Sequence, residues 1–178
     1  KHSLANLLGQ KNRYDEALEL IPEPSDAIGL QARYDLHLRA MIFMRMDNFD
    51  EAERLFNKGL LGARNDKRNN IFYKSLAVLK NRQEKHDEAL KHVECINEGA
   101  DAVTGIIHLH AVAGSKPVEQ IKTVLQSVTA MPKKSAEIKV VDMLVRAYGL
   151  GENDNYHRAS SADNIELSNA EISMMLAA

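Results

Sequence analysis

Apolar residues recur along this chain at the three- and four-residue spacing that is typical of amphipathic helices. Residues 26–46 carry Leu36, Ala40 and Phe43 at this spacing, and residues 69–83 carry a similar set. Each of these segments is followed by a short turn and then by a second helical pattern. The sequence therefore predicts an all-α fold built from pairs of helices.

A short motif marks the start of the second helix in each pair. It occurs as YDEAL at residues 14–18, FDEAE at 49–53 and HDEAL at 86–90, so the offsets are 35 and 37 residues. A weaker copy, YHRA, stands at residues 156–159, and Pro117 follows a turn at the place of the intervening copy. Asp and Glu favour the first turn of a helix because they face the positive end of its dipole. The motif predicts a helix–turn–helix unit repeated about every 35 residues.

This layout resembles the tetratricopeptide repeat (TPR) family. The third copy departs from the family with Lys80 at an aromatic position, and in the first copy Pro22 and Pro24 end the second helix early. An irregular bundle, in which the repeated strings are chance helix starts, is the alternative. The second copy fits best, with Ala40, Phe43, Phe49, Ala52, Phe56 and Gly59.

The resemblance implies a single domain, a right-handed α-α superhelix of four to five stacked helical hairpins, the last two degenerate. The sequence begins with Lys1 rather than Met, so we expect a fragment of a longer chain. The expected repeats span residues 1–24, 26–63, 67–98, 100–131 and 135–178.

In this family the concave surface binds partner segments, so the resemblance implies a groove lined by the first helix of each hairpin. Its cations would pair with carboxylates, and its methionines offer adaptable apolar contact. We therefore expect an acidic, partly hydrophobic peptide or helix as the partner. The implied groove residues are Asn6, Gln10, Tyr34, His37, Met41, Arg45, Lys74, Asn81 and Arg82, with Met44, Ile71, Val78, His110 and Tyr148 as further positions.

Composition narrows the function classes. The chain has 178 residues, 23 Lys and Arg against 25 Asp and Glu, and a net charge of −2, which disfavours a nucleic-acid binder. The single cysteine, Cys95, excludes an intrachain disulfide and indicates a reducing compartment, for which we expect the cytoplasm. No apolar run approaches the length of a membrane span, so we expect no membrane insertion.

The sequence offers no set of residues that points to catalysis, a cofactor or a metal. His108 and His110 are two residues apart and would point to different faces of a helix. His92 and Cys95 share a face, but two ligands do not make a zinc site. No phosphate-binding glycine loop or metalloprotease motif is present. We therefore expect a protein without enzymatic activity.

Three functions stay open on the sequence alone. The first is a scaffold or adaptor that binds a partner protein on its concave face. The second is a regulatory or sensor arm of a larger multidomain protein, and the third is an enzyme or metal site around Cys95. The last segment, residues 154–178, either caps the repeat array or associates with the groove of its own or a neighbouring chain.

Overall fold

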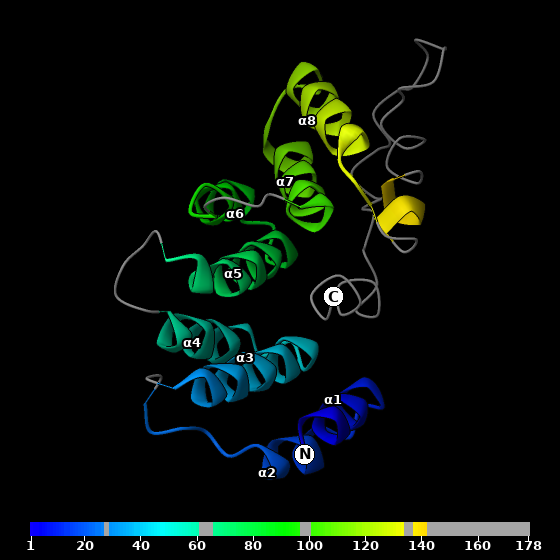
Figure 1. The fold of residues 1–178 in the computed structure, drawn as a ribbon. Coiled ribbons are helices and arrows are strands. Elements are labelled where there is room, and N and C mark those ends of the chain that lie inside the picture. The colour runs from blue at the N-terminus through cyan, green and yellow to red at the C-terminus, as the bar shows by residue number, and fades with distance from the viewer. Residues whose placement is uncertain (27–28, 61–65, 97–100, 134–136, 142–178) are drawn as a thin grey trace.

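The computed structural model describes residues 1–26, 29–60, 66–96, 101–133 and 137–141, and these are helical or in turns without a strand (Figure 1). The prediction of an all-α chain is confirmed for these residues. Residues 137–141 add a short helical segment at the end of the described chain. The other elements are α1 (His2–Gln10), α2 (Tyr14–Leu20), α3 (Leu30–Arg45), α4 (Phe49–Gly59), the 3-10 helix η1 (Lys67–Asn69), α5 (Asn70–Arg82), α6 (His86–Val93), α7 (Ala102–Ser115) and α8 (Val118–Ala130).

The helices pack as hairpins that follow one another in chain order, from α1 and α2 at the bottom of Figure 1 to α7 and α8 at the top. Each odd-numbered helix packs against the helix after it. It also contacts the first helix of the next hairpin, as α1 contacts α3, α3 contacts α5 and α5 contacts α7. The second helix of a hairpin also contacts the first helix of the next hairpin, so each interface between hairpins involves three helices.

The repeated motif coincides with helix starts, because α2, α4 and α6 begin at Tyr14, Phe49 and His86. Their first turns carry the Asp-Glu pairs, where the helix dipole favours negative charge. Ahead of the prolines at 22 and 24, α2 ends at Leu20.

The first three hairpins share one turn geometry. Asn12, Asp47 and Glu84 have φ values of 60°, 57° and 59°, and they are the described non-glycine residues with positive φ. In each turn the amide of the next residue bonds back across six residues, which is the Schellman arrangement at a helix end. These bonds are Arg13 N to Leu8 O at 2.9 Å, Asn48 N to Phe43 O at 3.0 Å and Lys85 N to Lys80 O at 2.9 Å. The turns therefore provide a common register for comparing the hairpins.

Small residues allow the helices to approach closely. Ala17, Ala52 and Ala89, the alanines of the repeated motif, are fully buried. Gly59 ends α4 against the ring of Phe72 in α5, where an added Cβ would lie 2.1 Å from Phe72 Cε1. A larger side chain at any of these positions would push neighbouring helices apart.

Lys80, which the sequence analysis noted as a departure from the TPR pattern, is only 5% exposed. Its ammonium group lies 2.8 Å from a carboxylate oxygen of Glu53 in α4 and 3.0 Å from one of Glu88 in α6. Burial lowers the pKa of Lys80, but the bonds to Glu53 and Glu88 outweigh it and the net shift is upward. The buried end of Lys80 thus links α4, α5 and α6 through two partly exposed carboxylates.

The core runs through the stack in two parts. The smaller cluster joins α1, α2 and α3 around Ala17 and Ile42, and the larger continues from α3 to residues 137–141. Among the described helices, none combines the length and the apolar character that crossing a bilayer requires.

Candidate functional site

The residues that the sequence places in a groove lie mainly on α1, α3 and α5. Counted back from the positive-φ residue of each turn, most stand 2, 6, 10 or 13 positions before it. This spacing brings them to one side of a helix. We call this set the first-helix face, and it consists of Asn6, Gln10, Tyr34, His37, Met41, Arg45, Ile71, Lys74, Val78 and Arg82.

Two side chains of the first-helix face expose apolar surface. Tyr34 is 52% exposed and Ile71 is 40% exposed, and they occupy equivalent positions on α3 and α5. The Tyr34 ring meets the His2 ring edge-on, with the ring centroids 4.9 Å apart and the planes at 89°. An exposed aromatic ring supported by a neighbour can contact a partner with little loss of side-chain entropy.

A polar cluster of His2, Gln31 and Asp35 lies beside Tyr34. His2 Nε2 lies 2.5 Å from Asp35 Oδ1 across the α1–α3 contact. The amide of Gln31 donates to the same carboxylate oxygen at 2.9 Å and lies 2.9 Å from His2 Nε2. Sequence reasoning missed this cluster because Asp35 stands next to Tyr34 without any motif to mark it.

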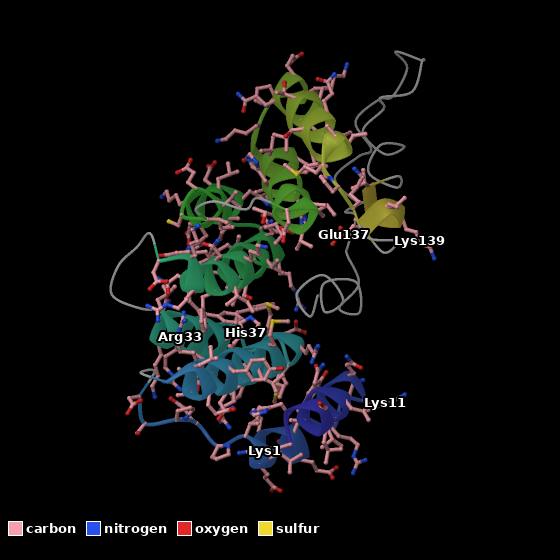
Figure 2. The ribbon with its side chains drawn as sticks, viewed as in Figure 1. Lys1, Lys11, Arg33, His37, Glu137 and Lys139 are labelled. Carbon is pink, nitrogen blue, oxygen red and sulfur yellow. The ribbon has the colours of Figure 1, made fainter. Side chains whose placement is uncertain are left out.

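His37, on α3, is only 8% exposed and contacts α5 (Figure 2). Its Nε2 is 2.8 Å from Ser75 Oγ, and that hydroxyl donates its proton to the carbonyl of Ile71. The imidazole therefore acts as the donor to Ser75. Burial lowers the pKa of His37 to about 4, so the ring is neutral at pH 7. It joins two hairpins and has little surface for a partner.

Two cations of the first-helix face already meet carboxylates of the chain. Lys74 Nζ lies 2.8 Å from Asp101 Oδ2, at the N-cap of α7. Arg82 donates to the carbonyl of Met44 at 2.8 Å and to Asp47 Oδ1 at 2.7 Å. An acidic partner would have to compete with Asp47 and Asp101, neither of which the sequence analysis had singled out.

The remaining groove candidates differ in what they expose. Met41 is 5% exposed, whereas Asn6 is half-buried and Gln10 is exposed. The guanidinium of Arg45 is half-buried beside Gly9 of α1, and burial lowers its pKa.

Asn81 is 4% exposed and contacts the neighbouring helices. Its amide nitrogen donates to the carbonyl of Ile107 in α7 at 3.2 Å, and its oxygen lies 3.2 Å from His86 Nδ1 in α6. The His86 ring lies 5.9 Å from that of His110, centroid to centroid. Burial, and to a lesser degree His86, lowers the pKa of His110 to about 4. This junction binds α5, α6 and α7 together.

Metal-ligating side chains do not gather in the part of the chain that the structure describes, where no three His, Cys, Asp or Glu residues could hold one ion. Cys95 is buried and its thiol donates to the carbonyl of Lys91. The further groove position Tyr148, most of the fifth expected repeat and the segment 154–178 lie outside the described residues.

Comparisons of this chain with protein-family models, with curated proteins and with solved structures find no match.

Proposed function

We propose that this chain is a TPR-like superhelical scaffold, without enzymatic activity of its own, that binds a segment of a partner protein on its first-helix face. The family assignment is supported by the register of the hairpins. The positive-φ residues of the three turns are separated by the same 35 and 37 residues as the repeated sequence motif. Stacked repeats of this kind form an extended surface suited to binding.

The observation that carries the binding proposal is the exposure of Tyr34 and Ile71 on a face whose other groups are held in place. His2 fixes the Tyr34 ring from one side, and the neighbouring His37, Lys74 and Arg82 all have partners within the chain. Such a surface is preorganised, so a partner pays little ordering cost on binding.

The chemistry of this face favours a partner segment that is mainly apolar at its centre. Carboxylates of the partner would reach Lys74 or Arg82 only by displacing Asp101 or Asp47. The acidic character expected from the sequence is therefore secondary in this proposal. We place the interaction in the cytoplasm, in keeping with the single reduced cysteine.

The test is a capture experiment from host lysate with the double variant Tyr34→Ser/Ile71→Ser. Both side chains are exposed, so the substitutions should leave the fold and its thermal unfolding unchanged. The matched control is Val118→Ser/Ile138→Ser, which removes two side chains of similar exposure (46% and 44%) outside the first-helix face.

We expect mass spectrometry to find proteins that the parent and the control capture and that the Tyr34→Ser/Ile71→Ser variant loses. Equal capture by all three chains would contradict binding through this face. Arg82→Glu is a less suitable variant because Arg82 also holds the Met44 carbonyl, so the charge reversal would disturb the contact between α3 and α5.

A further inference from the structure

One side of α1 repeats, at equivalent positions, a surface that is buried in the next two hairpins. Leu7 stands five residues before Asn12, as Ile42 does before Asp47 and Leu79 before Glu84. Ile42 and Leu79 are fully buried, whereas Leu7 is 51% exposed. Leu4, one turn earlier, is 50% exposed, and its equivalent on α5, Leu76, is fully buried. We call Lys1, Leu4, Leu7 and Lys11 the α1 edge.

The structure shows what covers this row in the second hairpin. Ile42 belongs to the cluster that contains Ala5 and Leu8 of α1 together with Ala17 of α2 and Ile21 just beyond it. The cover is therefore a pair of helices that presents small and branched apolar side chains.

The same interfaces also show how charge accompanies the apolar row. Cations of a first helix reach acceptors of the preceding hairpin. Lys80 pairs with Glu53 of α4, and Arg39 donates to the carbonyls of Leu18 and Ile21 at the end of α2, at 3.0 and 2.6 Å. Apolar contact at the centre and acceptors at the flank thus recur at the contacts between hairpins.

The α1 edge also carries cations, although Lys11 and Lys1 stand one and eleven residues before Asn12, whereas Lys80 and Arg39 stand four and eight residues before their own turn residues. Lys1 and Lys11 are exposed at the two ends of α1, as Figure 2 shows, and α1 itself contains no acidic residue. Within the described residues neither lysine forms an ion pair. A complementary surface therefore needs an apolar centre flanked by carboxylates or by carbonyls at a helix end.

A second copy of this chain meets that requirement poorly. If two α1 edges packed symmetrically, lysines would face lysines whether the two helices ran parallel or antiparallel. Two half-exposed leucines on each side would also bury far less than the 1,200 Å² or so that stable interfaces bury. A stable partner for the α1 edge must therefore bury a larger area than a second α1 helix can.

We propose that the α1 edge is a docking surface for an amphipathic helical hairpin of a partner protein, seated as α3 and α4 are seated on α5. The partner hairpin carries small and branched apolar residues at its centre, with acidic side chains toward Lys1 and Lys11. This surface lies on a different side of α1 from the first-helix face, so the proposal does not depend on the function proposed above.

The test uses the full chain with a tethered probe. Residues 29–72, which contain α3 and α4, are fused ahead of Lys1, so that the added hairpin stands to α1 as the original stands to α5. Leu7→Cys in a Cys95→Ala background reports whether the edge is covered, through its rate of reaction with a maleimide. Ile42→Cys in the same background gives the rate for a covered position.

We expect fusion to slow the reaction at position 7 by at least tenfold and to raise the thermal midpoint. Leu4→Glu, which places a charge at the centre of the covered row, should restore the fast reaction in the fused chain. An unchanged rate in the fused chain would overturn the proposal. Slow reaction at position 7 in the unfused chain would also overturn it. If the protection depended on protein concentration, a second copy would be the cover, and if the protected protein were a monomer, the chain would cover the edge itself.

Discussion

The replacement of Gly59 by alanine tests the close contact on which the stacking of α4 against α5 depends. The added Cβ would lie 2.1, 2.4 and 2.8 Å from Phe72 Cε1, Cζ and Cδ1. Carbon atoms in contact are normally about 3.5–4.0 Å apart. Either the ring or the whole of α5 must therefore move by more than 1 Å or so.

The surroundings of Phe72 leave little room for that movement. The ring is 1% exposed and meets His37 edge-on at 5.6 Å between centroids. The Arg33 guanidinium lies 5.0 Å from the ring centroid, and its Nε donates to the Gly59 carbonyl at 2.9 Å. A displaced ring would disturb both contacts.

We expect Gly59→Ala to lower the free energy of unfolding by about 1–3 kcal/mol, the usual cost of overpacking a core. This estimate holds although alanine favours a helix over glycine by up to about 1 kcal/mol. The assay is chemical denaturation followed by circular dichroism. Gly29→Ser is the control, because its Cβ has no atom within 4 Å and serine caps the start of α3 well.

A double-mutant cycle with Phe72→Leu identifies the cause. If the clash with the ring destabilises the protein, Gly59→Ala should cost less when Phe72 is already leucine. A Gly59→Ala variant as stable as the parent would refute the close packing of α4 on α5. Equal costs in both backgrounds would place the effect elsewhere.

Three further predictions concern a turn, a buried histidine and two carboxylates. Glu84 holds a positive φ that asparagine adopts more readily. Glu84→Asn should therefore raise the free energy of unfolding by about 0.5–1 kcal/mol. A lower free energy of unfolding in chemical denaturation would contradict the turn geometry. The pKa of His37 falls from 6.5 to about 4 on folding, so the folded state binds fewer protons between these values. His37 should therefore lower the free energy of unfolding by up to about 3 kcal/mol as the pH drops through this window, and His110, with a pKa of about 4, adds to the fall. Denaturation at several pH values should show a smaller fall in the free energy of unfolding for His37→Gln than for the parent. Parallel pH profiles of the two proteins would argue against this role of His37. The double variant Asp47→Asn/Asp101→Asn releases Arg82 and Lys74 but keeps side chains suited to the turn and the N-cap. In anisotropy titrations at low salt, it should bind an acidic fluorescent peptide up to about tenfold more tightly than the parent. Equal affinity for the parent and the variant would exclude these cations from binding.

The sequence alone determined the local features of this protein. Helix starts at 14, 49 and 86 follow from residues that favour the first turn, and the prolines at 22 and 24 stand just beyond the end of α2. These effects act within a few residues, so a linear pattern records them. The turn residue Glu84 was not evident, because glutamate carries no preference for positive φ.

Only the tertiary structure decided which side chains pair across hairpins. His37 and Ser75 are 38 positions apart, and Arg82 and Asp47 are 35 apart. Their contacts depend on the rotation of each helix and on how closely neighbouring hairpins approach, and a linear pattern contains neither quantity. The same reason explains why Asn81 and Met41, which the sequence placed in the groove, are almost fully buried. Whether a polar residue binds a partner or holds the fold together depends on the helices beside it.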